Sequence, residues 1–207
     1  MQDFFKNLPQ YAALITASIA IFLFLLKEFL ESRRKKKERE QNRFAVNMVA
    51  SIQGIKILKQ LLFILQISNE FKNINSESNI VIKVDHLSKA RKIIINEDRI
   101  IIVPEATDKF SYEVILLVAK LGYEKFALFS NMNDANTYLS DTINVFLKKI
   151  EKNEIKRVCY ELKQTKGLKK MVGTHLNGLA PISASMEKNK DYKSIMKKIE
   201  EELNRLL

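Results

Sequence analysis

Few residues in this chain have side chains suited to catalysis or metal binding. The 207-residue sequence contains two histidines, His86 and His175, and one cysteine, Cys159. Neither histidine has acidic or thiol side chains at metal-ligand spacing, so the pattern predicts no zinc or iron site. A lone cysteine cannot form an intramolecular disulfide. We therefore expect neither a metal nor an organic cofactor.

A nucleophile–base pair is the one catalytic arrangement that the spacing suggests. Ser183 and Ser185 follow His175 within ten residues, and a serine hydroxyl needs such a neighbouring base to become a nucleophile. However, the Gly-x-Ser-x-Gly turn that exposes a hydrolase serine is absent. His175 also falls on the apolar stripe of a predicted helix, which favours a structural histidine. A hydrolase stays an alternative hypothesis.

The clearest pattern is an uncharged run followed by a dense basic block. Residues 11–26 carry no charge. The residues of this run that we expect to face lipid are Tyr11, Leu14, Ile15, Ile19, Ile21, Phe22, Leu23, Phe24, Leu25 and Leu26. A helix of this length reaches about 24 Å, and its apolar flanks extend it towards the ~30 Å of a hydrocarbon core. We therefore expect residues 11–30 to form a transmembrane anchor.

The basic block predicts how the anchor is oriented. It contains Lys27, Arg33, Arg34, Lys35, Lys36, Lys37 and Arg39. Positive charge collects on the cytoplasmic side of membrane proteins. The pattern thus predicts a single pass through the cytoplasmic (inner) membrane, with residues 1–10 outside, a basic juxtamembrane helix over residues 31–43, and residues 44–207 in the cytoplasm. These cations could act as a topology signal or as a docking site for anionic lipid headgroups.

The uncharged run could also belong to a cleaved secretion signal or to a buried helix of a soluble domain. A cleaved signal has positive charge before its apolar run and small residues after it, whereas this order is reversed here. The lack of a disulfide and of any Asn-x-Ser/Thr sequon fits a domain in a reducing compartment. The order of charges therefore favours the anchor over a cleaved signal.

A second apolar run, residues 55–67, follows a helical rhythm that begins at Phe44 and includes Met48, Ile52, Ile55, Leu58, Leu62 and Leu65. The run contains Lys56 and Lys59, and two lysines inside a bilayer would cost roughly 5–7 kcal/mol. We expect a helix buried in the cytosolic domain, with a surface-lying helix or a second span as alternatives.

The remaining pattern predicts a mainly α fold with a small β-hairpin or sheet, an α+β class. Alternating residues 80–84 and two isoleucine runs around residues 96–98 place this sheet within residues 79–104. A helix that Thr107 or Asp108 could cap is expected to include Phe110 and to stop at Gly122. Further helices are expected over residues 139–150, after a cap-rich segment at 131–137, over residues 155–162, with Cys159 on the apolar face, and over residues 168–178. An amphipathic helix is expected in the tail from Lys188. Residues 178–185 are expected to form a loop, and Glu200, Glu201 and Glu202 a solvated acidic patch.

The net charge of +11 could indicate that the chain binds nucleic acid. Basic surfaces attract phosphate backbones, but lysine far exceeds arginine here, and arginine is the better reader of bases and phosphates. An AT-rich genome would enrich lysine without any such function. We do not expect a nucleic-acid partner. The expected partners are membrane lipid and either a second copy of the chain or a membrane-associated protein.

In layout the chain resembles uncharacterised bacterial single-pass membrane proteins with a mostly helical cytosolic domain. The stretch that carries the likeness is LITASIAIFLFLLKEFLESRRKKK, residues 14–37, with the helix that follows from Arg43. The resemblance implies an N-terminal anchor, a basic collar and a helical domain. It implies no activity and no functional residues.

These patterns support three hypotheses of function. The first is a non-catalytic, membrane-tethered cytosolic interaction module acting as a scaffold, sensor or regulator. The second is a membrane-perturbing effector, in which several subunits bring residues 55–67 and the anchor together to open a pore. The third is the hydrolase built on His175.

Overall fold

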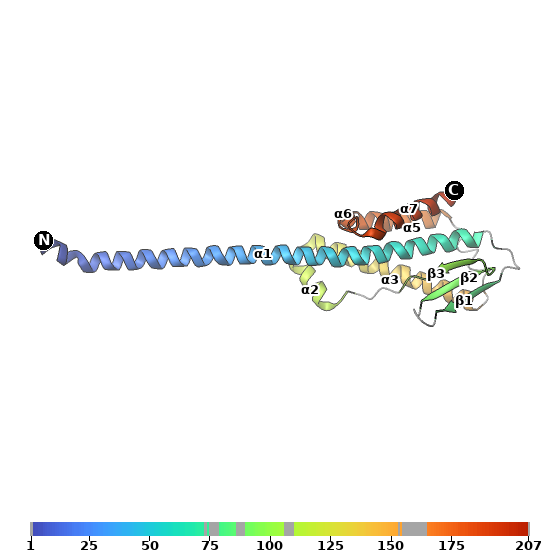
Figure 1. Cartoon of the computed structure of the whole chain (residues 1–207), viewed down its shortest axis with the longest axis horizontal. Coiled ribbons are helices and arrows are strands. Elements are labelled where there is room, and N and C mark those ends of the chain that lie inside the picture. The colour runs from blue at the N-terminus through green and yellow to red at the C-terminus, as the bar shows by residue number, and fades with distance from the viewer. Residues whose placement is uncertain are drawn as a thin grey trace. The chain divides into compact units, whose positions relative to one another are not determined.

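The computed structural model describes residues 2–72, 74, 79–85, 90–105, 110–152, 154 and 165–206, with side chains described at Ala12, from Ile15 onward in the first helix, and from Gly167 onward in the last group of helices. The chain divides into two compact units, Met1–Ala45 and Val46–Leu207. It is mostly helical with one small three-stranded antiparallel sheet (Figure 1). The predicted α+β class is confirmed.

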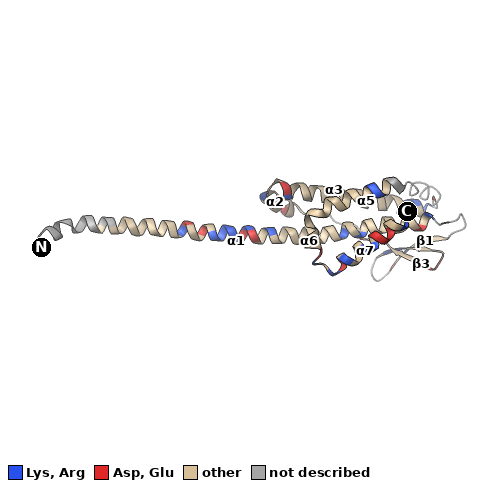
Figure 2. Cartoon of the chain, turned by 90° about the horizontal axis from the view of Figure 1, so that it is seen from above, with Lys and Arg blue, Asp and Glu red and all other residues tan. Residues whose placement is uncertain are grey.

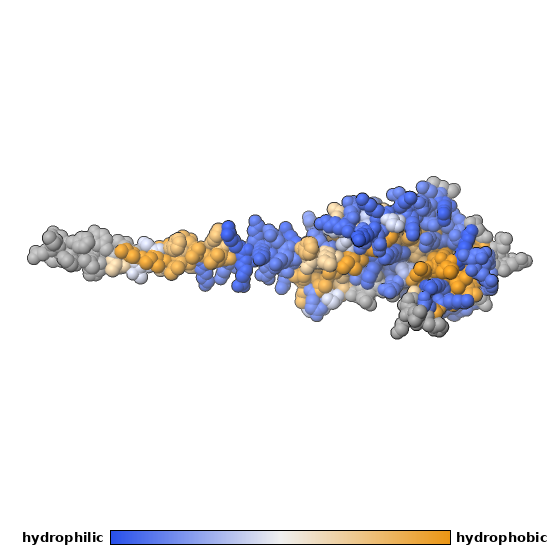
Figure 3. Space-filling view, in the orientation of Figure 1, coloured by the Kyte–Doolittle hydropathy of each residue, from blue (hydrophilic) through white to orange (hydrophobic). Residues whose placement is uncertain are grey.

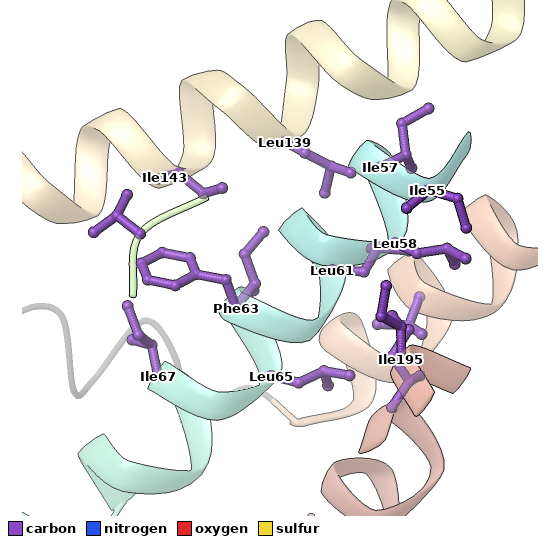
Figure 4. Packing of buried hydrophobic residues seen from close by; sticks show 14 of the residues in the cluster. Ile55, Ile57, Leu58, Leu61, Phe63, Leu65, Ile67, Leu139, Ile143 and Ile195 are labelled. Atoms are coloured by element: carbon purple, nitrogen blue, oxygen red, sulfur yellow. The ribbon is translucent and has the colours of Figure 1, made fainter. Parts of the chain in front are cut away.

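Helix α1 runs from Gln2 to Lys72 and contributes to both units. The first unit contains only the N-terminal part of this helix. In the second unit, the C-terminal part of α1 supplies the centre of the hydrophobic core (Figure 4). Val46 is the first buried residue of the described chain.

The second apolar run lies in this core, as the first of its three alternatives predicts. The buried side chains between residues 55 and 67 are Ile55, Ile57, Leu58, Leu61, Phe63, Ile64, Leu65 and Ile67. Lys56 and Lys59 are not among them, and Lys59 forms an exposed ion pair with Asp191 at 3.4 Å.

The predicted helix runs through the start of this segment, but the apolar residues that mark its rhythm there are not the buried ones. Phe44, Met48 and Ile52 are 70%, 57% and 46% exposed, whereas Val46 and Ala50 are buried. Both stripes are apolar enough to form an inner face, so periodicity alone does not choose between them. The elements that pack on α1 determine which stripe is buried. Ser51 Oγ donates to the carbonyl oxygen of Ser185, which lies on the short helix covering this side of α1.

The sheet consists of β1 (Ile80–Val84), β2 (Arg91–Ile95) and β3 (Arg99–Ile102), in the order β1-β2-β3. All pairs are antiparallel. The predicted strand and hairpin are therefore confirmed. Asn96 and Glu97, in the turn between β2 and β3, both have positive φ, at 50° and 65°.

Two helices follow the sheet. Helix α2 spans Tyr112–Lys120 and begins at Ser111, whose hydroxyl accepts a hydrogen bond from the Val114 backbone N–H. Gly122 has φ 110° and separates α2 from α3, Tyr123–Glu151. The predicted stop at Gly122 is correct. Two other residues considered as the α2 cap, Thr107 and Asp108, lie outside the described residues.

The cap-rich segment at 131–137 is not a helix start. Helix α3 passes through it without a break, Asn136 is buried, and the Thr137 hydroxyl donates to the Asn133 carbonyl within the helix. Polar residues that favour caps in isolation are held inside a helix here because their apolar neighbours pack on the core.

Helix α5 spans Thr165–Leu179, η1 spans Ala180–Ile182, α6 spans Ser183–Met186 and α7 spans Lys190–Arg205. The loop expected at residues 178–185 is therefore helical. Leu179 and Ile182 within this range are buried, and this burial explains the ordered turns. The amphipathic tail is confirmed. Glu202, expected in a solvated patch, is instead buried.

Candidate functional site

The first candidate site is the N-terminal section of α1. Every described residue from Ile15 to Leu30 is exposed, and Phe22 and Phe24 are 63% and 62% exposed. The other predicted lipid-facing residues that share this exposure are Ile15, Ile19, Ile21, Leu23, Leu25 and Leu26. The side chains of Tyr11 and Leu14 lie outside the described residues.

The exposed apolar residues surround the helix instead of forming a stripe. Ile21 to Leu26 occupy six consecutive positions, and six positions cover every direction around a helix of 3.6 residues per turn. A surface helix of a soluble domain would keep one polar face. A helix that is apolar on every side needs apolar surroundings on every side, either lipid or protein.

The Thr16 hydroxyl in this section is satisfied within the helix. Thr16 Oγ1 donates to the Ala12 carbonyl oxygen at 2.8 Å, and Ser18 also has an interaction partner. A polar group in hydrocarbon is costly unless it is hydrogen-bonded internally. The threonine in this section therefore does not oppose insertion into an apolar medium.

The basic collar, defined as Lys27, Arg33, Arg34, Lys35, Lys36, Lys37 and Arg39, follows the apolar section on α1 (Figure 2). All seven residues are exposed. The Arg33 guanidinium lies 4.7 Å from the centre of the Phe29 ring, and Lys35 lies 3.8 Å from the Glu31 carboxylate. Such exposed pairs contribute little to stability, so most of the collar charge is available to an anionic surface.

One helix in the described part of the chain, the Ile15–Lys72 section of α1, is long and apolar enough to cross a membrane by length and composition. Its qualifying 18-residue stretch has a mean hydropathy of 1.5 and is 56% buried in the protein. No described residue before Val46 is buried, so this stretch belongs to the core section. A core helix passes such a test, and the N-terminal section must be judged by its own side chains.

The second candidate site is an open cleft of about 440 Å³ between α3 and α5. His175 lines it beside Tyr138, with ring centres 5.9 Å apart. Burial lowers the pKa of His175, which favours the neutral form of its imidazole. The other residues lining the cleft are Asn131, Met132, Asp134, Ala135, Thr174, Gly178 and Leu179.

The structure does not bring the predicted nucleophiles to His175. Ser183 lines a separate depression with Leu58 and Tyr192, and Ser185 uses its carbonyl oxygen to accept a hydrogen bond from Ser51. The serine–histidine pair of the alternative hydrolase hypothesis is therefore not assembled. Within the described ranges no three His, Cys, Asp or Glu side chains could hold a metal ion. His86 and Cys159 lie outside those ranges.

The sequence patterns did not reveal the α3 side of this cleft. Asn131, Asp134 and Tyr138 follow one another at spacings of three and four, which place them on one helical face. The spacing is present in the sequence, but it places these residues on one face only if residues 131–138 are helical. Interpreting residues 131–137 as a helix cap concealed the face.

Comparisons with protein-family models, with curated proteins and with solved structures found no match.

Proposed function

We propose that this chain is a single-pass membrane protein whose Val46–Leu207 unit acts in the cytoplasm as a non-catalytic interaction module. The observation that carries the proposal is the contrast between two apolar sections of α1. Residues 55–67 are buried in a protein core, whereas residues 15–30 are exposed on every side. Lipid is the surrounding that would satisfy the exposed section.

The free energy of insertion favours this role. Each Leu, Ile or Phe near the centre of an inserted helix contributes roughly −0.3 to −0.6 kcal/mol, so the nine such residues between positions 11 and 26 contribute about −3 to −5 kcal/mol. In water the same side chains would expose a continuous apolar surface, which soluble proteins avoid. The proposed anchor covers residues 11–30.

The basic collar supports the proposed orientation. Positive charge is retained on the cytoplasmic side, and each basic residue near an anionic leaflet gains about 1 kcal/mol. The collar would thus hold the N-terminus outside and residues 44–207 in the cytoplasm. Anionic lipid headgroups are the first proposed partner, and nucleic acid is not proposed.

A second partner is proposed because the Val46–Leu207 unit has exposed apolar side chains of its own. Tyr112, Leu116 and Tyr123 lie exposed on and beside α2. Aromatic and aliphatic residues of this kind form the anchors of protein interfaces. Tethering to a membrane raises the effective concentration of such a surface for another membrane-bound chain. The partner would be a second copy or another membrane-associated protein.

The membrane-perturbing role has less support. It would require residues 55–67 to leave the core in order to insert, which would expose the centre of the Val46–Leu207 unit. The cleft beside His175 likewise offers a histidine without an adjoining nucleophile, so we do not propose a hydrolase.

The anchor can be tested by placing one charge in its centre. Leu23→Arg should cost about 2.5–3.5 kcal/mol of insertion free energy, most of what the apolar residues contribute. We expect the full-length variant to shift from the alkaline-resistant membrane pellet to the supernatant. Phe44→Arg is the matched control, because Phe44, like Leu23, is an exposed apolar residue of α1 but lies beyond the collar. Recovery of the unaltered protein in the supernatant would overturn the proposal.

The orientation is tested separately by protease protection in sealed cells. A tag after Leu207 should resist added protease until the inner membrane is opened, whereas a tag before Met1 should be removed at once. Digestion of the C-terminal tag in sealed cells would reverse the proposed topology without affecting the anchor.

A further inference from the structure

The outer edge of β3 is unoccupied among the described residues. The strand order β1-β2-β3 places β3 at one end of the sheet (Figure 1), and within the described part of the chain it pairs with β2 alone. A free edge presents unpaired N–H and C=O groups that can accept another strand. The question is which groups this edge offers.

The hydrogen-bond pattern identifies those groups. The backbone N–H of Val103 donates to the carbonyl of Arg91 at 2.9 Å. In an antiparallel pair the bonded positions alternate, so Ile101 and Arg99 also face β2, through their partners Ile93 and Ile95. The N–H and C=O groups of Ile100 and Ile102 therefore point outward from the edge.

The side chains at the same positions are exposed as well. Ile100 and Ile102 are 60% and 63% exposed. By register, Ile94 and Val81 continue the row across the sheet from Ile100, and apolar surface gathers over the sheet in Figure 3. Natural edge strands are usually protected by lysine, proline or a bulge. Between Arg99 and Val103 the sequence contains neither lysine nor proline.

We propose that β3 pairs antiparallel with β3 of a second copy of this chain, around a two-fold axis at Ile101. Ile100 of one copy then lies opposite Ile102 of the other. This register uses both outward N–H groups and both outward C=O groups of each strand. The sheets of the two copies become one continuous sheet of six strands.

The strand is suited to pairing with itself. In this register the outward isoleucines meet isoleucines, and β-branched side chains suit the pleated surface of a sheet. Arg99 lies opposite Val103 and not opposite the Arg99 of the other copy, so the register avoids a repulsion between like charges. Arg99 is in addition engaged by an ion pair with Glu70 of its own chain.

The pairing rests on the proposed function in one respect. A strand of four residues offers few hydrogen bonds, and short strand pairs are marginal in water. Confinement of two copies to one membrane raises their effective concentration, which allows such a weak contact to form. The inference thereby names the second partner of the proposed interaction module.

Cysteine crosslinking tests the register. Ile100→Cys and Ile102→Cys are made separately in the full-length chain with Cys159→Ser, carry tags of different size, and are co-expressed and oxidised in membranes. Directly opposite residues have Cα atoms about 5.5 Å apart, within disulfide range. We expect the mixed pair to crosslink at least fivefold more than either variant alone. Equal yields, or crosslinks only to other proteins, would overturn the proposal.

A second variant separates pairing from folding. Ile102→Pro removes an outward N–H without removing a bond to β2, and proline is tolerated on such an edge. Energy transfer between two labelled copies in vesicles should fall to background, whereas Ile102→Val should retain it, with the helical circular dichroism unchanged in both. Persistent energy transfer with Ile102→Pro would contradict the pairing.

The outcomes also distinguish the two proposals. A chain that stays in the membrane pellet but gives no register-specific crosslink refutes strand pairing and leaves the anchor intact. A chain found in the supernatant refutes the anchor, and with it the membrane confinement that the strand pairing requires.

Discussion

Asn69 Nδ2 donates a hydrogen bond of 2.7 Å to the Glu202 carboxylate, and both side chains are buried. The same nitrogen also donates to the backbone carbonyl of Glu202 at 2.8 Å. Arg205 donates to the other carboxylate oxygen at 3.1 Å. A buried carboxylate is stable only when its oxygens are paired. These contacts therefore fasten the C-terminal helix α7 to the end of α1.

Asn69→Ala should destabilise the protein by roughly 1–3 kcal/mol, because it leaves one carboxylate oxygen and one carbonyl of Glu202 buried without their donor. Denaturant unfolding followed by circular dichroism measures the loss. Asn204→Ala is the control, since Asn204 is exposed on α7, and should change stability by less than about 0.5 kcal/mol. Equal effects of the two changes would show that the buried pair is not stabilising.

Gly54 on α1 lies close to side chains of η1 and α6. A Cβ atom added there would lie 2.5 Å from Met186 Sδ and 3.0 Å from Ile182 Cδ1, both in the core. Alanine normally gains up to about 1 kcal/mol over glycine in a helix, but crowding a packed core costs about 1–3 kcal/mol. Because the crowding is larger, we expect Gly54→Ala to lower the free energy of unfolding by about 1 kcal/mol.

Gly173→Ala is the matched comparison in α5. A Cβ atom there would meet nothing within 4 Å. Only the higher helix propensity of alanine over glycine should therefore change the free energy of unfolding. We expect a gain of about 0.5–1 kcal/mol, measured by the same unfolding experiment. If both alanines stabilise the protein, the close approach at Gly54 is relieved by a movement of Met186.

The turn between β2 and β3 offers a stabilising change. Glu97 has φ 65°, a region that costs an ordinary L residue roughly 1 kcal/mol and glycine almost nothing. Glu97→Gly should therefore raise the thermal midpoint by a few degrees. Asn96→Gly should not, although Asn96 also has positive φ. Its Oδ1 accepts a hydrogen bond from the Asn79 backbone N–H at 3.0 Å, and glycine would remove that bond.

His175 predicts a loss of stability in mild acid. Burial lowers the pKa of His175, so the unfolded chain takes up a proton at a higher pH than the folded chain does. The stability it contributes is complete above the ordinary histidine pKa of about 6.5 and declines as the pH falls below that value. Asp134 and Tyr138 face it across the cleft from α3, and the other lining groups are uncharged.

The pH effect is measured as the change in the thermal midpoint between pH 7.5 and pH 5.5. His175→Gln, which cannot be protonated, should show a smaller decrease in the thermal midpoint than the unaltered chain. His86 is present in both proteins, so its effect on the midpoint cancels in the comparison. A decrease of the same size in the two proteins would assign the acid sensitivity to other groups.

Strong local patterns were enough to predict the sheet and the tail helix. The alternation at residues 80–84 and the isoleucine runs on either side of Asn96 match strands β1 to β3 within two residues. The tail is amphipathic enough that its inward residues, such as Ile195 and Ile199, are the buried ones. In both cases the local preference and the tertiary packing agree.

Other features depend on packing partners that no local pattern encodes. The choice between the Phe44 and the Val46 face of α1 depends on where α6 lies. Glu202 looks like a surface acid beside Glu200 and Glu201, and only the approach of Asn69 explains its burial. The cleft beside His175 could be predicted only from a continuous helix through Asn131, but the polar residues there favoured a helix cap. Each of these arises from contacts between residues far apart in sequence.

The boundary at Val46 has a consequence for how the protein could be cut. Every peptide bond of the basic collar precedes the first core residue, and its lysines and arginines are the residues after which trypsin-like proteases cleave. A single cut after Arg39 would leave every side chain of the Val46–Leu207 core in one fragment. That fragment would keep the core contacts of the Val46–Leu207 unit and would lose the proposed anchor.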